Sequence, residues 1–432
     1  MNIVFCTTCK GRTEHLLKTL PKNLADNPEA KFVILDYNDQ DTLAAFFKAN
    51  HTSDIESGRL IVYKYKEPVR FHMAHAKNMV HRLGVMEGAD ILVNLDADNF
   101  TGCGFARYIS EQLADRKDAF MWARMVKDTG MTRGISGRIA VTRNAFFLVG
   151  GYDEKYTTYS PDDKDFNARL RRLGQEGLEI DPRFLLAVLH NDKIRYREYP
   201  HVASTATEDF YIQQHNTVVN AGSVGCGTVW RNFAPKPICI APIPTRIFGI
   251  GMHKTATTSL HTALQTLGFL SGHWQNAHWA KAVWREMNQT GKSPTLEKFY
   301  ALSDLPIPLL FRKLDVAYPG SKFILTLRDE WNWLTSVRKH WNAAYNKFRC
   351  QWDDDPFSHR IHEILYGRRD FDPSTFLARY RRHNAEVLEY FQDRPQDLLV
   401  MDMEKKHGWK ELCDFLSVPV PVENYPTILP TV

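Results

Sequence analysis

The sequence predicts an α/β protein with two domains, each built around a mostly parallel sheet. Apolar strand-like segments alternate with helical segments from the first residues onward, and a second series of the same kind begins at Arg246. Strands that alternate with helical segments of about 10–15 residues form βαβ units, whose strands run parallel. A length of 432 residues suits two or three domains, since one domain typically takes about 100–200 residues.

The first half supplies four strands and three helices before residue 100. Its apolar runs are short, as is typical of buried strands, and helical periodicity separates them. The expected strands cover residues 2–6, 31–35, 60–63 and 90–95, and the expected helices cover 13–20, 42–48 and 74–83.

A proline-rich segment separates the two series. Four prolines lie between Asn232 and Pro244, and proline at this density prevents a regular helix and stiffens a linker. We therefore expect a first domain at residues 1–235, a linker at 236–244 and a second domain at 245–432.

The second domain opens with a phosphate-binding signature. The segment Arg246–Leu260 reads as a short buried strand, a glycine-containing turn, and a run of hydroxyls after Lys254 that enters a helix. Backbone N–H groups at a helix start and the helix dipole attract an anion, and a lysine adds charge. The segment differs from a nucleotidase P-loop, because His253 stands where the second glycine should be.

A second anion-binding pair follows the next apolar strand, at residues 322–328. Arg328 ends that strand, and Ser336 lies on the helix expected after it. The two side chains could therefore converge on one anion. A helix at 408–416 and a proline turn at Val418–Pro421 follow near the C-terminus.

Together these features resemble the sulfotransferases that use 3′-phosphoadenosine 5′-phosphosulfate (PAPS), over roughly residues 245–432. The resemblance implies that the loop grips the 5′-phosphosulfate, and that Arg328 and Ser336 grip the 3′-phosphate. The loop residues that it assigns to the donor are Lys254, Thr255, Ala256, Thr257, Thr258 and Ser259.

Sulfuryl transfer is an in-line displacement at sulfur. It needs a cation at the bridging oxygen and a base for the acceptor's proton. Lys254 fits the first need. Asp304 is favoured as the base, since it resembles an acid at that place in related bacterial sulfotransferases, although it could also cap a helix. His273 is the competing base, because an imidazole titrates near neutral pH.

The first half carries a different signature, in which the fourth strand runs into Asp96 and Asp98. Ligands of open α/β sheets bind beyond the carboxyl ends of the strands. Two acids at i and i+2 can there offer oxygens to a hard divalent cation, which a diphosphate leaving group needs. Without other evidence, two aspartates at this spacing often belong to an ordinary turn.

The segment Asn94–Asn99 resembles the metal-binding motif of A-type glycosyltransferases, the inverting family-2-like group especially. Pro161–Arg169 resembles the acceptor-side segment of that group, where one carboxylate of an acidic pair acts as base. The pair here is Asp162 and Asp163, where Glu-Asp is commoner, so either acid could be the base. The resemblance implies that Mn²⁺ or Mg²⁺ bridges the protein to a nucleotide-sugar.

This resemblance covers roughly residues 1–220. It implies that His190 completes the metal site, against the alternative of a surface histidine. Lys77, in a basic segment before a helix, could contact the donor or belong to a helix cap, and Asp36 could bind the base or ribose or cap a helix. The donor contacts expected in this half are Thr7, Arg12, Asp36 and Lys77.

Composition sets the expected compartment and partners. A formal charge of +5 gives no argument for nucleic acid, but a mild positive field suits anionic donors. The chain enters a strand at once and has no long apolar stretch, which predicts neither a leader nor a transmembrane helix and leaves room for peripheral membrane contact. Seven scattered cysteines indicate a reducing cytoplasm. Cys6 and Cys9 could form a redox pair or half a zinc site, but the favoured interpretation is that Cys6 ends a strand and Cys9 lies in a loop.

The sequence therefore predicts a bifunctional cytoplasmic enzyme. It would transfer a sugar from a nucleotide-sugar, with inversion, and a sulfuryl group from PAPS to a glycan or glycolipid acceptor. One alternative is a glycosyltransferase whose second domain is a non-catalytic nucleotide-binding or interaction module. The other is a carbohydrate-binding scaffold. Lys254, Arg328 and Ser336 together argue against the first, and the acid pairs argue against the second.

Overall fold

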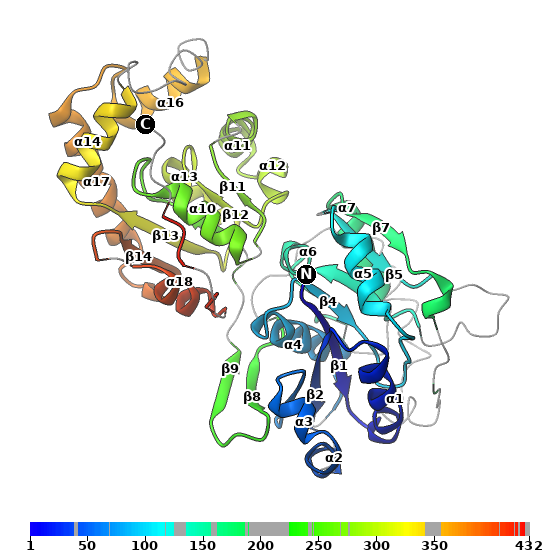
Figure 1. The fold of residues 1–432 in the computed structure, drawn as a ribbon. Coiled ribbons are helices and arrows are strands. Elements are labelled where there is room, and N and C mark those ends of the chain that lie inside the picture. The colour runs from blue at the N-terminus through cyan, green and yellow to red at the C-terminus, as the bar shows by residue number, and fades with distance from the viewer. Residues whose placement is uncertain are drawn as a thin grey trace. The chain divides into compact units, whose positions relative to one another are not determined.

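The chain forms two compact units, Met1–Ile243 and Pro244–Val432, and each is described by itself (Figure 1). The computed structural model describes residues 1–38, 42–68, 70–116, 118–124, 135–156, 162–185, 189, 224–240, 244, 246–267, 269–274, 277–341, 356–405, 407–418, 420–421 and 424–427. Among the helices of these ranges, none has the length and apolar character needed to cross a membrane.

The first unit alternates strands and helices as the sequence predicts, around a nine-stranded sheet of order β7-β5-β6-β4-β1-β2-β3-β8-β9. The four strands β3, β2, β1 and β4 run parallel at its centre. The elements are β1 (Ile3–Cys9), α1 (Thr13–Asp26), β2 (Lys31–Tyr37), α2 (Thr42–Asn50), α3 (Thr52–Glu56), β3 (Leu60–Tyr65), α4 (Met73–Met86), β4 (Ile91–Asn94), α5 (Phe105–Leu113), β5 (Ala119–Trp122), β6 (Ile139–Thr142), α6 (Arg143–Leu148), α7 (Asp162–Arg172), β7 (Glu176–Glu179), β8 (Gly227–Arg231) and β9 (Pro237–Ile240).

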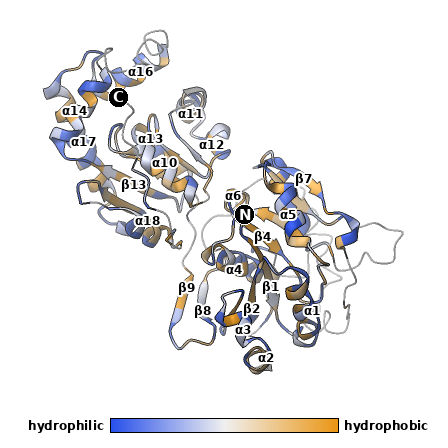
Figure 2. Cartoon of the chain, in the orientation of Figure 1, coloured by the Kyte–Doolittle hydropathy of each residue, from blue (hydrophilic) through white to orange (hydrophobic). Residues whose placement is uncertain are grey.

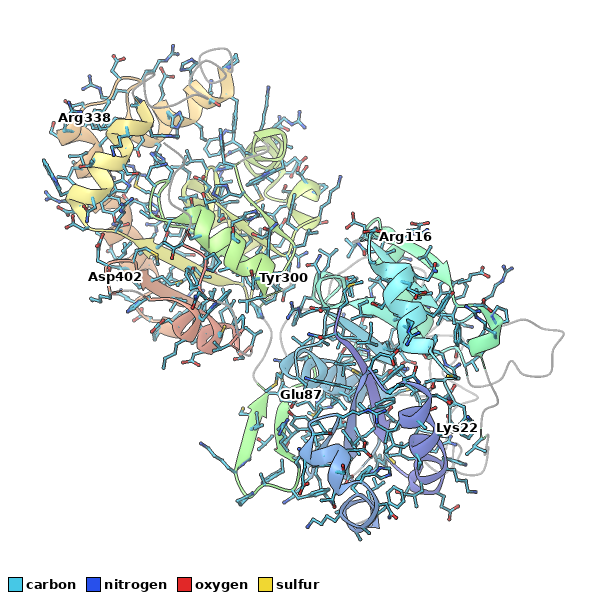
Figure 3. The ribbon with its side chains drawn as sticks, viewed as in Figure 1. Lys22, Glu87, Arg116, Tyr300, Arg338 and Asp402 are labelled. Carbon is cyan, nitrogen blue, oxygen red and sulfur yellow. The ribbon has the colours of Figure 1, made fainter. Side chains whose placement is uncertain are left out.

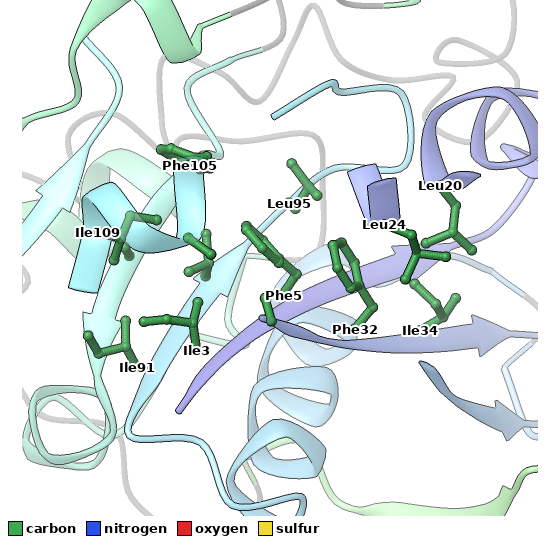
Figure 4. Packing of buried hydrophobic residues seen from close by; sticks show 14 of the residues in the cluster. Ile3, Phe5, Leu20, Leu24, Phe32, Ile34, Ile91, Leu95, Phe105 and Ile109 are labelled. Atoms are coloured by element: carbon green, nitrogen blue, oxygen red, sulfur yellow. The ribbon is translucent and has the colours of Figure 1, made fainter. Parts of the chain in front are cut away.

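One face of this sheet packs against α1 and α5. Phe5 of β1 stacks on Phe32 of β2, with ring centroids 4.7 Å apart, and lies 6.1 Å from the ring of Phe105. Figure 4 shows these rings beside the leucines of α1 and the isoleucine of α5. The strands are correspondingly hydrophobic in Figure 2. The burial of these side chains holds the central strands in place, because apolar area removed from water stabilises a fold.

The other face packs against α4, which comes very close at Gly84. A Cβ there would lie 2.8 Å from Leu92 Cδ2 and 2.9 Å from Cys6 Sγ. Cys6 therefore faces α4, whereas Cys9 belongs to the apolar cluster on the opposite face. Burial raises the pKa of the Cys6 thiol far above its usual range. The two cysteines are core residues on opposite faces of β1, since side chains three apart on a strand point to opposite faces. Cys9, expected in a loop, is instead the last residue of β1.

Part of the expected linker belongs to the first sheet. Pro237–Ile240 forms β9, which pairs antiparallel with β8 at the edge of the sheet. Proline is tolerated at the first residue of an edge strand, because its missing N–H is not needed by a neighbour there. β8 in turn is held by Arg231, whose guanidinium lies 2.7 Å from the carboxylate of Glu87 at the end of α4. Figure 3 labels Glu87.

The second unit contains a five-stranded, all-parallel sheet of order β11-β12-β10-β13-β14. The first residue of this unit, Pro244, accepts a hydrogen bond at its carbonyl oxygen from the hydroxyl of Tyr300, at 2.6 Å. The elements are β10 (Ile247–Gly249), α10 (Thr257–Thr266), β11 (Ser271–Gly272), α11 (Ala277–Thr290), α12 (Pro294–Glu297), β12 (Ala301–Ser303), α13 (Ile307–Ala317), β13 (Lys322–Leu327), α14 (Glu330–Trp341), α16 (Pro356–Tyr366), α17 (Pro373–Tyr390), β14 (Leu398–Asp402) and α18 (Trp409–Leu416).

Candidate functional sites

The loop between β10 and α10 is tightly wound. Lys254 and Ala256 both have left-handed φ angles, of 67° and 69°, a conformation that costs energy for residues other than glycine. Gly251 is required where the loop presses on β13, because a Cβ would lie 2.0 Å from the hydroxyl oxygen of Thr326. Strained backbone of this kind persists only where the surrounding structure fixes it, as at a binding loop.

Three expected site residues converge at the carboxyl ends of three neighbouring strands. Lys254 follows β10, Asp304 follows β12 and Arg328 follows β13. Burial lowers the pKa of Lys254; Asp304 opposes this shift and Arg328 adds to it. Arg328 also donates from Nη1 to the carbonyl oxygen of Lys254, at 3.4 Å. The site therefore has two cations beside one carboxylate, which suits a ligand with two anionic groups.

The hydroxyl of Thr255 is bonded within the loop, whereas the other loop hydroxyls lie in the first turn of α10. Thr255 is completely buried, and its hydroxyl donates to the carbonyl of Met252 at 2.6 Å. Its side chain is thus engaged inside the loop, and its N–H also points to Met252. Thr257 and Ser259 are buried in the first turn of α10 and Thr258 is half-buried. Ser336 is half-buried on α14.

The two candidate bases, Asp304 and His273, are in direct contact. His273 Nε2 lies 3.2 Å from Asp304 Oδ2 and 3.2 Å from the hydroxyl oxygen of Thr257. Burial lowers the pKa of His273, an effect that Asp304 opposes and Lys254 reinforces. The other carboxylate oxygen of Asp304 accepts the N–H of Leu305 at 2.9 Å. The cap of α13 is Pro306, and no side chain of the described residues bonds to the first turn of that helix, so Asp304 does not cap it.

Trp274 and Trp331, two of the tryptophans near this site, differ in exposure. Trp274 is half-buried and stacks on Phe357, with centroids 6.0 Å apart, so it packs within the unit. Trp331 is 75% exposed in the first turn of α14, three residues after Arg328. Its indole remains accessible to a flat ligand.

In the first unit, Asp96 and Asp98 lie just beyond the end of β4. Asp98 pairs with Arg12 at 3.3 Å, which joins two of the expected site residues from different strand ends. Burial raises the pKa of Asp96 to about 6, with Lys77 opposing and the carboxylates of Asp98 and Asp163 adding to the shift. Carboxylates crowded in this way match the oxygen ligands that a hard divalent cation prefers, so Asp96 and Asp98 fit a metal chemically.

The third expected metal ligand, His190, lies outside the described residues. Within the described ranges, no group of three or more His, Cys, Asp or Glu side chains is arranged to hold a metal ion. The backbone at Gly137 packs directly against the carboxylate of Asp96, since a Cβ there would lie 2.8 Å from Asp96 Oδ2. Arg138, missed from the sequence, is buried next to Gly137, and its guanidinium interacts electrostatically with Asp96 and Asp98.

Lys77 is bound to the acidic pair of α7. Its Nζ lies 2.7 Å from Asp162 Oδ2 and 2.6 Å from Asp163 Oδ1. Burial opposes the charge of Lys77, but the two carboxylates outweigh it and hold the pKa of Lys77 well above its usual range. The ammonium that we expected at the donor is thus already paired with the acids expected at the acceptor.

The two acids of this pair have different environments. Burial raises the pKa of Asp162 to about 7, with Lys77 opposing and Asp163 adding to the shift. The side chain of Asp162 is 3% exposed and that of Asp163 is 14% exposed. Asp163 is therefore the acid that a sugar acceptor could reach. The next acid, Asp165, is buried and bound to Arg169 at 2.8 Å.

Thr7 and Asp36 both lie inside the sheet. Thr7 is buried within β1, beside Ile34 of β2. Asp36 is buried near the end of β2, where its carboxylate lies 3.5 Å from the ammonium of Lys64. Asp36 therefore does not begin a helix, which removes the capping alternative. Its place at the carboxyl edge of the sheet is where a ligand of an open α/β sheet binds.

Residues 246–429 match the sulfotransferase domain family. A curated relative, "Ava biosynthesis cluster protein M" of Aspergillus versicolor, is 24% identical over 219 residues, which cover 42% of this chain and 80% of that protein. The second unit is therefore a sulfotransferase domain, as its loop, arginine and C-terminal segment indicate.

The solved structures to which this chain is similar include two glycosyltransferases. The catalytic domain of Drosophila β1,4-galactosyltransferase 7 is 13% identical, with a TM-score of 0.33 over 56% of this chain and 92% of that one. The mannosyltransferase PcManGT of Pyrobaculum calidifontis is 12% identical, with a TM-score of 0.34 over 90% of this chain and 87% of that one. At these scores the likeness supports no inference, so the assignment of the first unit rests on its own residues.

Proposed function

We propose that this chain is a bifunctional transferase, which adds a sugar from a nucleotide-sugar and a sulfuryl group from PAPS to a glycan or glycolipid acceptor. The observation that carries the proposal is the convergence of Lys254, Asp304 and Arg328 inside the sulfotransferase domain. The acid cluster of Asp96, Asp98 and Asp163 supports the second activity, because two of these acids suit a metal and the third suits a base.

In the second unit, the donor's 5′-phosphosulfate would lie against the loop at the start of α10. The acceptor oxygen forms a bond to sulfur as the bond from sulfur to the bridging oxygen breaks. Lys254 stabilises the charge that develops on that bridging oxygen, and Asp304 takes the acceptor's proton. Arg328 binds the 3′-phosphate with Ser336, since charge-assisted contacts from arginine to phosphate are strong.

In the first unit, Asp96 and Asp98 would hold Mn²⁺ or Mg²⁺. Such a metal, when bound, neutralises the diphosphate that leaves as the sugar is transferred. Arg12, which is bound to Asp98, would contact that diphosphate as well. Asp163 accepts the acceptor's proton, because it is the more exposed acid of its pair. Lys77 orients Asp163 through the contact between Nζ and Oδ1. A single displacement at the sugar inverts its anomeric configuration.

A ligand screen by thermal unfolding tests both donor assignments. A ligand that binds only the folded state raises the apparent stability by an amount that grows with the logarithm of its concentration relative to Kd. We expect 3′-phosphoadenosine 5′-phosphate to raise the melting temperature without metal, and at least one UDP- or GDP-sugar to raise it only with Mn²⁺ or Mg²⁺. A chain that responds to neither class would lose the proposed function.

A further inference from the structure

We infer that Trp333 and Tyr380 form a spacer that fixes the distance between the Lys254 loop and Arg328, and so select a donor that has phosphates at both its 5′ and 3′ positions. This inference rests on the proposed function of the second unit. It concerns two residues that need not touch the donor, so their role is one of positioning.

Trp333 fixes the loop just before Lys254. Its indole is completely buried on α14, and Nε1 donates to the carbonyl oxygen of His253 at 3.0 Å. The ring of His253 is held separately, since Nε2 lies 3.0 Å from the hydroxyl of Tyr366. The residue preceding Lys254 is thus held through both its backbone and its side chain.

Tyr380 fixes the backbone of Arg328. Its hydroxyl accepts the N–H of Arg328 at 3.0 Å and donates to the carbonyl of the same residue at 2.9 Å. One side chain therefore satisfies both backbone groups of Arg328. The hydroxyl replaces the partners that the end of β13 would otherwise need.

The side chains of Trp333 and Tyr380 stack on each other and complete a closed series of contacts. The rings of Trp333 and Tyr380 are 4.3 Å apart and tilted by 16°, and Figure 1 shows the helices that carry them, α14 and α17. This series of contacts runs from Lys254 through His253, Trp333 and Tyr380 to Arg328. It closes where Arg328 Nη1 donates to the carbonyl oxygen of Lys254.

α17 also holds the start of the loop directly. His383, three residues after Tyr380 and on the same face of the helix, donates from Nε2 to the carbonyl of Ile250 at 2.8 Å. One helix therefore bonds to the backbone at the ends of both β10 and β13. Because buried aromatic rings are closely packed, the distance between the Lys254 loop and Arg328 is fixed before any ligand binds.

Such a spacer benefits a ligand only if the ligand engages both points. A donor with two phosphates gains from preorganisation, since neither point has to be moved to meet it. A nucleotide with a 5′-phosphate alone uses the Lys254 loop and is indifferent to the position of Arg328. Removal of the Tyr380 hydroxyl should therefore change ligand discrimination as well as affinity.

The test compares two ligands by titration calorimetry on the full chain, 3′-phosphoadenosine 5′-phosphate and adenosine 5′-phosphate. In Tyr380→Phe, which keeps the stacked ring, we expect the first ligand to bind roughly tenfold more weakly, a factor of ten being about 1.4 kcal/mol. The second ligand should bind within about twofold of wild type, because it does not use Arg328. Tyr318→Phe is the matched control, since that buried hydroxyl bonds to Ser293, away from both points, and it should alter neither affinity.

In Tyr380→Phe, equal losses of affinity for both ligands, or no loss for either, would overturn the spacer. Trp333→Phe gives an independent test if Tyr380→Phe fails to fold. It removes the donor to the His253 carbonyl and should weaken both ligands, because both use the Lys254 loop; unchanged binding of both would count against the inference. A wild-type chain with no preference for the 3′-phosphate would instead remove the proposed function itself, and the spacer with it.

Discussion

Asp304 Oδ2 lies 3.2 Å from His273 Nε2, so the two side chains that compete for the role of base are bonded partners. The same nitrogen also meets the hydroxyl of Thr257. The other nitrogen, Nδ1, is buried and has no hydrogen-bond partner in the described part of the chain. An acceptor has no access to a buried Nδ1, so we propose Asp304 as the base and a positioning role for His273.

This assignment predicts unequal effects of two substitutions. Asp304→Asn should slow sulfuryl transfer by about 10²–10⁴-fold, the usual contribution of a positioned base, with little change in donor affinity. His273→Gln keeps an N–H that can reach Asp304 and should cost much less. Single-turnover rates with PAPS measure both. If His273→Gln slows sulfuryl transfer more than Asp304→Asn does, His273 is the base and Asp304 the positioning residue.

Asp98→Ala should abolish sugar transfer and leave sulfuryl transfer to a ready-made acceptor unchanged. The reason is the loss of one carboxylate ligand for a divalent cation. Rates of the two transfers, measured with and without EDTA, check this. Glu179→Ala removes an exposed acid of the same unit and should behave as wild type. Sugar transfer that survives both EDTA and Asp98→Ala would contradict the metal assignment.

The role of Asp163 predicts the stereochemistry of the product. If this acid accepts the acceptor's proton, the displacement is single and the anomeric configuration of the sugar inverts. NMR of the anomeric proton in the product shows which configuration forms. Asp163→Asn should lose most of the activity. A product with the donor's configuration would rule out the base role of Asp163.

His81 predicts a pH dependence of stability in the first unit. Burial lowers its pKa to about 4, whereas an unfolded histidine titrates near 6.5. The unfolded chain therefore binds the additional proton, and stability falls as the pH drops from about 6.5 to about 4, by about 3 kcal/mol in total. His81→Gln should lack this component. Urea unfolding of both proteins across the range gives the difference, and two parallel pH profiles would refute the assignment.

The two units should fold separately. Each exceeds the size at which a domain can bury a core of its own, and among the described strands none belongs to both sheets. Fragments 1–243 and 244–432 should both give cooperative unfolding by circular dichroism. A fragment that ends at Pro235 should be less stable than the first, because it lacks β9. Insoluble or molten products from both longer fragments would mean that the units depend on each other.

Local pattern predicted the central strands but not the edges of the first sheet. β1, β2, β3 and β4 fall where the apolar runs indicate. β8 pairs with β3 through partners such as Arg231 and Tyr63, which lie far apart in sequence and leave no periodic signal. The same holds for Pro237, since proline density suggests a linker, whereas an edge strand tolerates proline at its first residue.

The sites divide in the same way. Lys254 and the pair Asp96 and Asp98 are found from the sequence because each stands in a local motif at a strand end. The bond from Lys77 to Asp162 spans 85 residues, and the bond from Tyr380 to Arg328 spans 52. Only packing of whole elements brings these groups together, so neither contact could be read from spacing.

The central claim is that one chain has two donor sites of different chemistry. Titration calorimetry measures this directly, with nucleotide-sugars and Mn²⁺ added to the full chain already saturated with 3′-phosphoadenosine 5′-phosphate. We expect one nucleotide-sugar to bind at one equivalent with an affinity unchanged by the first ligand, and Arg328→Ala to lose only the first ligand. Competition between the two ligands, or equal affinity for ATP and 3′-phosphoadenosine 5′-phosphate, would contradict the account.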